Sequence, residues 1–121
     1  MAQIEVVKPN RDGTFPEARL IVTDANASVV FDLRGDDWHY ATIQMLARGA
    51  VDLTSLVNKV RISNDGSNPV DFPAGAVTLS AVGITTTLTV TAINFLHVTF
   101  TTAGTSGTVA FLARASRARS I

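Results

Sequence analysis

Side chains with catalytic potential are few in this chain, and they stand apart. The two histidines, His39 and His97, are far from each other in the sequence and have no second ligand nearby. A zinc site needs three or four ligands, so we expect no metal centre. Asp36 and Asp37 are adjacent, and adjacent side chains on a strand point to opposite faces. They are therefore not a carboxylate pair for acid–base chemistry.

Three short motifs also favour turns over chemistry. The Asn-Asp-Gly run at 64–66 offers too few oxygen ligands for a calcium loop and predicts a tight turn. Ser106 lies in a Gly-Thr-Ser-Gly run without the pattern of a nucleophile elbow, which indicates a loop. The Arg-Gly-Asp run at 34–36 spells a cell-adhesion tripeptide, but a match this short is better explained as a turn. With no cysteine and no phosphate-binding glycine motif, the sequence predicts a protein that is not an enzyme and holds no cofactor.

Trp38 and Tyr40 carry the one candidate binding motif. If both are exposed on one face of a strand, they form a platform on which a sugar can stack. The alternative, which we favour, is that Trp38 anchors the core.

The most unusual feature of the sequence is a long span without charge. No Asp, Glu, Lys or Arg occurs between Asp71 and Arg114. Threonines interrupt the span repeatedly, so it is not a membrane-spanning helix. Charged side chains normally solvate the outer faces of strands, so we expect these strands to be covered by neighbouring protein.

The charges outside this span are unevenly placed. All ten acids and seven of the ten bases lie at or before Asp71, a balance of −3, and Arg114, Arg117 and Arg119 supply +3 near the C-terminus. Residues 114–121 are expected to form a basic tail, either solvated or used in a head-to-tail subunit contact. Formal net charge is zero, which argues against nucleic-acid binding. The N-terminus lacks the features of a signal peptide, so we expect synthesis in a cytoplasm, where the protein stays or is packed into a particle.

The hydrophobic pattern predicts an all-β protein. At 121 residues the chain is expected to be a single antiparallel β-sandwich or jelly-roll-like barrel, domain 1–121, with an extended arm over 1–16. Alternation predicts strands at 19–23, 28–33, 60–63, 77–81, 87–92, 96–101 and 109–112, with another beginning at Val70. The first two are expected to pair as a hairpin across the turn at 24–27.

The segment from Asp36 to Val60 is ambiguous. As a helix it would place Trp38, Ala41 and Met45 on one stripe. As a strand it would place Trp38 with Tyr40 on one face and Ala41 with Met45 on the other. Its aromatic and β-branched content favours the strand.

Three segments carry a resemblance to a known class of proteins. They are the aromatic-led strand at 37–44, the strand running into the Asn-Asp-Gly turn at 60–68, and the expected closing hairpin at 95–111. In this order they resemble small β-sandwich virion proteins of tailed bacteriophages, of the capsid decoration (cement) or head-fibre type. The resemblance implies a virion location and no catalytic residues. The uncharged span from Phe72 to Ala113 departs from the pattern, and it suits a subunit contact better than a sugar-binding face.

The resemblance and the span together lead to one functional hypothesis. We expect a structural protein that forms a homo-oligomer, with a trimer favoured, and clamps neighbouring major capsid protein subunits, without nucleic-acid or membrane partners. The expected subunit interface consists of Thr87, Thr89, Thr91, Thr99 and Thr101. The expected capsid contacts are Ile4, Val6 and Phe15. The alternative is a carbohydrate-binding adhesion module of a fibre or tail.

Overall fold

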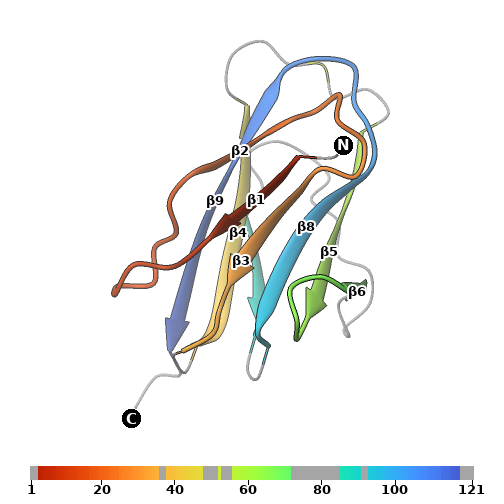
Figure 1. Cartoon of the computed structure of the whole chain (residues 1–121). Coiled ribbons are helices and arrows are strands. Elements are labelled where there is room, and N and C mark those ends of the chain that lie inside the picture. The colour runs from red at the N-terminus through yellow and green to blue at the C-terminus, as the bar shows by residue number, and fades with distance from the viewer. Residues whose placement is uncertain are drawn as a thin grey trace.

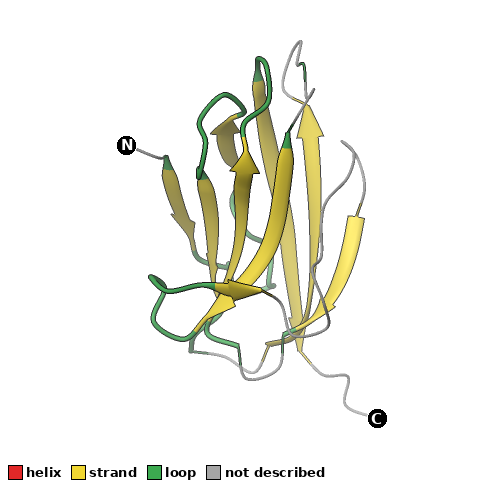
Figure 2. Cartoon of the chain, turned by 90° about the vertical axis from the view of Figure 1, so that its right-hand side faces the viewer, coloured by secondary structure: helices red, strands yellow, loops and turns green. Residues whose placement is uncertain are grey.

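The computed structural model describes residues 3–35, 38–47, 52, 56–71, 85–90 and 93–117. These residues form nine strands, and no helix occurs among them (Figure 2). No membrane-spanning helix is found in this described part of the chain. The strands are β1 (Ile4–Val7), β2 (Ala18–Ile21), β3 (Ser28–Asp32), β4 (Trp38–Ala47), β5 (Val57–Ser63), β6 (Val70–Asp71), β7 (Thr85–Thr89), β8 (Phe95–Thr102) and β9 (Thr108–Arg117).

The strands form two sheets (Figure 1). One has five strands in the order β1-β3-β8-β5-β6, and the other has four in the order β2-β9-β4-β7. All described strand pairs are antiparallel except β1 with β3, which is parallel. The prediction of an all-β sandwich is confirmed.

The core lies between the sheets and is built from alternate residues of their central strands. Leu96, Val98 and Phe100 of β8 are at most 1% exposed and belong to the main apolar cluster. Phe100 meets Phe111 of β9 across the sandwich, with ring centroids 6.2 Å apart. A buried aromatic pair of this kind contributes about 0.5–1.5 kcal/mol beyond its area burial.

The uncharged span is explained by where its strands lie. β8 has β3 and β5 as neighbours, and β9 has β2 and β4. Even on the face of β8 away from the core, His97 and Thr99 are only 3% and 7% exposed. At these two residues the cover that we predicted from a partner is supplied by the chain itself.

The ambiguous segment from residue 38 to residue 47 is a strand, β4, but its faces differ from the expectation. The register of β4 against β9 shifts between Trp38 and Tyr40, which is a β-bulge. The extra residue turns Trp38 to the core side, where Ala41 and Ile43 are also buried. Tyr40 is 42% exposed, so the expected pairing of Trp38 with Tyr40 on one face was wrong.

Both expected hairpins were also wrong. β2 and β3 lie in different sheets, and so do β8 and β9. Alternation shows which residues face the core, but two strands from opposite sheets and two paired strands give the same pattern. The predicted strand at 77–81 lies outside the described residues.

Both terminal segments contribute residues to strands. Residues 4–7 of the expected arm form β1, which pairs with β3, and β9 extends to Arg117 within the expected tail. Gln3 joins the two sheets at this edge. Its Nε2 donates to the carbonyl of Arg19, at 3.0 Å, and its Oε1 accepts from the Ile21 amide, at 3.1 Å. The side chain therefore pairs with alternate residues of β2 as a neighbouring strand would.

Gly13 and Gly35 have the same kind of backbone conformation, but a side chain at Gly13 would also meet neighbouring atoms. Gly13 has φ +90° and Gly35 has φ +89°, values that favour glycine. A Cβ at Gly13 would collide with the backbone of Ala115, whereas nothing lies within 4 Å of one at Gly35. We expect Gly35→Ala to lower the free energy of unfolding by about 1–2 kcal/mol and Gly13→Ala by about 3 kcal/mol or more. Urea unfolding of both variants tests this, and equal losses would contradict the placement of Gly13 against β9.

Candidate functional site

A pocket of about 430 Å³ lies beside the ends of β1 and β3. The loop after β1 contributes Lys8 to Arg11, and Trp38 comes from the start of β4. Asp32 ends β3, and the turn that follows contributes Arg34 and Gly35. Parallel pairing of β1 with β3 places these segments at the same end of the sheet.

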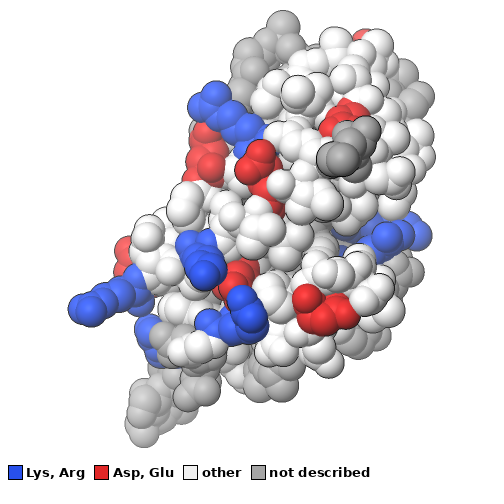
Figure 3. Space-filling view, in the orientation of Figure 1, with Lys and Arg blue, Asp and Glu red and all other residues white. Residues whose placement is uncertain are grey.

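Three cations and one described acid line this pocket. Lys8, Arg11 and Arg34 are exposed, whereas Asp32 is 5% exposed. Figure 3 shows Lys and Arg side chains gathered around an acidic one at the lower left, where the loop after β1 lies in Figure 1. The described residues therefore give the pocket an excess of positive charge.

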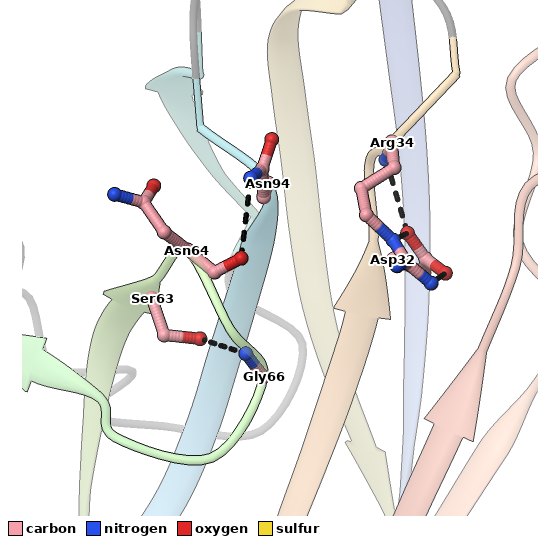
Figure 4. Close-up of polar contacts among 6 residues, drawn as sticks. All are labelled: Asp32, Arg34, Ser63, Asn64, Gly66 and Asn94. Atoms are coloured by element: carbon pink, nitrogen blue, oxygen red, sulfur yellow. Dashed lines mark hydrogen bonds and ion pairs between the residues drawn. The ribbon is translucent and has the colours of Figure 1, made fainter.

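Asp32 and Arg34 form a two-pronged ion pair (Figure 4). Arg34 Nε donates to Asp32 Oδ1 at 3.1 Å, and Nη2 donates to Oδ2 at 2.9 Å. The hydrogen bond from Arg34 holds the pKa of Asp32 below its usual value, and the charge of Lys8 adds to the effect. The Arg34 guanidinium also lies 4.7 Å from the ring centroid of Phe95, which fixes it in place.

Trp38 closes the pocket from the core side. It is 5% exposed, and the Arg117 guanidinium lies 4.4 Å from its ring centroid. Its Nε1 is buried and has no acceptor among the described residues. A buried donor left in this state costs about 1–3 kcal/mol. Trp38 is thus a core anchor with one polar atom unused, and it does not share a sugar-stacking platform with Tyr40.

An apolar strip runs along the same sheet edge toward the pocket. Ile4 and Val6 of β1 are 65% and 58% exposed. Val6 is paired with Val30 of β3, which is buried but outside the main core cluster. We call Ile4, Val6 and Val30 the β1 strip.

The expected capsid contacts divide between surface and core. Ile4 and Val6 are exposed as that expectation requires. Phe15 is 3% exposed and packs edge-on against Phe31 at 5.1 Å, so it is a core residue and not a contact. An isolated aromatic residue in a loop sequence gives no sign of which side it faces.

The expected threonine interface does not form one surface. Thr87 and Thr89 belong to β7 of the four-stranded sheet, and Thr91 lies outside the described residues. Thr99 and Thr101 belong to β8 of the five-stranded sheet. Thr99 is buried with its hydroxyl 3.0 Å from that of Ser28, and Thr101 Oγ1 donates to the Val57 carbonyl at 3.4 Å.

The structure brings together one pair that sequence reasoning missed. Ser63 Oγ lies 2.7 Å from His97 Nε2, and it also accepts from the Gly66 amide at 3.0 Å. The two side chains come together because β5 and β8 are paired in the sheet. No spacing in the sequence signals this contact. Both residues are buried, at 7% and 3% exposure, so this is a structural contact and not an accessible nucleophile–base pair.

Ser63 of this pair supports the predicted Asn-Asp-Gly turn by accepting from the Gly66 amide (Figure 4). Gly66 has φ +79°, and Asn94 Nδ2 donates to the Asn64 carbonyl at 3.1 Å. Asp65 Oδ1 accepts from the amides of Ser67 and Asn68 at 2.9 and 3.0 Å. These bonds, the one from Ser67 first, lower the pKa of Asp65 to about 2. The Asp65 carboxylate is therefore used within the turn. No cluster of three metal-ligating residues is found in the described part of the chain.

Comparison with known proteins gives a fold and no family. No protein-family model and no curated protein sequence matches the chain. Among solved structures, it is similar to the pre-peptidase C-terminal domain of a collagenase from Bacillus anthracis, with TM-score 0.54, 8% identity, and coverage of 96% of this chain and 97% of that one. It is equally similar to PliG, a periplasmic inhibitor of g-type lysozyme from Aeromonas hydrophila, with TM-score 0.54, 9% identity, and coverage of 96% and 100%.

A third similar structure is a larger protein. It holds the M60 catalytic domain with the CBM51-1 and CBM51-2 domains of Clostridium perfringens ZmpB, and the match has TM-score 0.53 and 21% identity. The match covers 90% of this chain and 12% of that one. At these identities the likeness shows a shared β-domain fold and nothing more, and none of the three is named as a virion protein.

Burial of His97 makes stability depend on pH. Burial lowers the pKa of His97 below its usual value, and the charge of Arg61 also lowers it while that of Asp65 acts against this. The unfolded chain then binds the proton more readily, so the stabilisation is present above about pH 6.5 and is lost as pH falls below it. We expect the free energy of unfolding to fall between about pH 6.5 and 5, before the carboxylates titrate, and His97→Gln to remove this slope.

Urea unfolding across this range measures the slope, and ring proton shifts in wild-type protein measure the His97 pKa directly. A His97 pKa at or above its usual value would contradict the argument, and so would an unchanged slope in His97→Gln.

Proposed function

We propose that this chain is a non-enzymatic structural protein of a tailed-phage particle, a capsid decoration protein that works by contacts with other protein chains. The observation that carries the proposal is the β1 strip. Two large β-branched side chains, Ile4 and Val6, lie more than half exposed on one strand at the edge of the described five-stranded sheet.

Such an edge is costly to leave uncovered. Edge strands present unpaired backbone groups, and proteins normally blunt them with charge, proline or a covering segment. Between Ile4 and Val7 the only charged residue is Glu5, and Ile4 and Val6 alternate with it. Covering a large aliphatic side chain completely contributes about 1.5–3 kcal/mol. A partner seated on β1 would gain this from each of the two.

The remainder of the domain suits a passive scaffold. Three of its described acids are used locally: Asp32 by Arg34, Asp65 by its turn, and Asp12 by the Thr14 amide at 3.0 Å. The Ser63–His97 pair is buried. A stable interface covers about 800 Å² per partner, so the β1 strip would be the centre of a contact that extends onto neighbouring loops.

Self-association tests the first part of this proposal. We expect the wild-type chain to form a homo-oligomer, with a trimer favoured, and Ile4→Lys with Val6→Lys to leave its mass unchanged, because the β1 strip is the contact for the capsid and not for other copies of the chain. Ile21→Lys is the matched control for an added lysine, since Ile21 is 51% exposed but lies on β2 of the other sheet. Light scattering coupled to size exclusion gives the mass of each. A monomeric wild type would contradict the homo-oligomer, and dissociation by Ile4→Lys with Val6→Lys alone would show that β1 contacts a second copy of the chain instead.

The particle itself tests the second part. Mass spectrometry of purified virions from the phage that encodes the chain is expected to find it in a fixed ratio to the major capsid protein. Virions carrying the Ile4→Lys and Val6→Lys substitutions are expected to contain much less of it. Absence of the chain from wild-type virions would overturn the proposal.

A carbohydrate-binding role is the second candidate. It is favoured by the similarity to a structure that includes CBM51 domains, although that likeness concerns the fold. With Trp38 buried, the exposed ring available is Tyr40, which packs edge-on against His39 at 4.3 Å. Glycan binding by the isolated chain that is lost in Tyr40→Ala and kept in Ile4→Lys would support this role over the structural one.

A further inference from the structure

The geometry points to an acidic, extended peptide segment as the partner that lies along β1, with its carboxylates in the basic pocket. We propose that apolar residues of this segment cover the β1 strip and that the acidic residues following them meet Lys8 and Arg11. The inference rests on the proposed function and names the chemistry of its partner.

The pocket continues the β1 strip. Ile4 is paired with Ser28 and Val6 with Val30, and the next step of this alternation leads to Lys8 and Asp32. Lys8 and Asp32 both line the pocket, and the charge of Lys8 is one of the causes that lower the pKa of Asp32. In Figure 3 a largely uncharged area lies directly above the group of basic side chains. Apolar and basic surfaces therefore follow one another along one strand.

The charges of the pocket favour a carboxylate. Asp32 is already engaged by both prongs of Arg34, at 3.1 and 2.9 Å. Lys8 and Arg11 form no ion pair with a described carboxylate, since those found join Arg19 to Glu17 and Arg34 to Asp32. Guanidinium and ammonium groups bind carboxylates by charge-assisted hydrogen bonds. A pocket of about 430 Å³ has room for acidic side chains of a peptide.

An edge strand is also a template for an added strand. A peptide that pairs with an exposed edge gains backbone hydrogen bonds, and its alternate side chains give specificity. On β1 those alternate positions are opposite the β1 strip, and the pocket lies beyond its end. The expected partner sequence alternates apolar and polar residues and then becomes acidic.

The single tryptophan provides a direct signal, because Trp38 lines the pocket. The probe is the blocked peptide Thr-Val-Thr-Val-Thr-Asp-Asp-Asp, and its control has three asparagines in place of the aspartates. We expect the acidic peptide to change Trp38 fluorescence saturably and the control to bind about tenfold more weakly. Binding is expected to weaken as ionic strength rises from about 0.05 to 0.5 M. Equal binding of the two peptides, or none, would overturn the inference.

Matched variants locate the contact. Lys8→Gln with Arg11→Gln is expected to weaken the acidic peptide about tenfold. Arg19→Gln with Lys59→Gln removes the same charge elsewhere and is expected to leave binding nearly unchanged. An equal loss in both double variants would show a general charge effect and contradict the pocket.

Three further binding measurements test whether something other than a peptide occupies the pocket. Tight binding of inorganic phosphate or acetate alone would replace the peptide by a small anion, and calcium binding abolished by Asp32→Asn would replace it by a cation. Asp36 and Asp37 follow Gly35 and lie outside the described residues. Binding seen only in Asp36→Asn with Asp37→Asn would show that the chain's own carboxylates occupy the pocket. Any of these results overturns the inference, while self-association and incorporation into virions test the proposed function separately.

Discussion

The structure depends on the packing of β8 against β9 across the sandwich. These are the central strands of the described five- and four-stranded sheets, and their inward residues, Phe100 and Phe111 among them, are fully buried. A strand with a neighbour on each side and a core beneath it has little room for a charge, because an unpaired buried charge costs several kcal/mol. The uncharged span from Phe72 to Ala113 therefore includes β8 and the first part of β9, which lie at the centres of their sheets, and also β7 at the edge of the four-stranded sheet. The charges of β9, on Arg114 and Arg117, come toward its end, where both residues are exposed.

This constraint changes where a partner is to be sought. The missing charge first suggested that threonine faces met other subunits. In the structure Thr99 and Thr101 make hydrogen bonds within the chain, and Thr99 is covered by it. One exposed apolar surface lies instead on β1, at the edge of the sheet, and it leads into a pocket whose cations outnumber its described acids. The proposed function rests on that edge and not on the uncharged span.

Local alternation was enough to predict the all-β class and the inward residues of strands such as β8. Leu96, Val98 and Phe100 were assigned to one face of a strand from their spacing, and that face is the core. Alternation could not predict which strands pair. Two consecutive strands that lie in different sheets, such as β8 and β9, show the same alternating pattern as two strands paired in a hairpin. Alternation also could not predict the bulge after Trp38. One extra residue there moves the Trp38 side chain to the other face of β4, and the hydrophobic pattern does not signal it. The pocket was missed because Lys8, Asp32 and Trp38 come from three segments that meet only through the parallel pairing of β1 with β3 and the entry into β4.

The central claim is that β1 is covered by another protein chain in the assembled particle. A cryo-electron-microscopy map of the particle at side-chain resolution tests it most directly. The account predicts that Ile4 and Val6 lie in contact with a neighbouring chain and that acidic residues of that neighbour approach Lys8 and Arg11. A map in which the chain is present but both apolar side chains face solvent would contradict it.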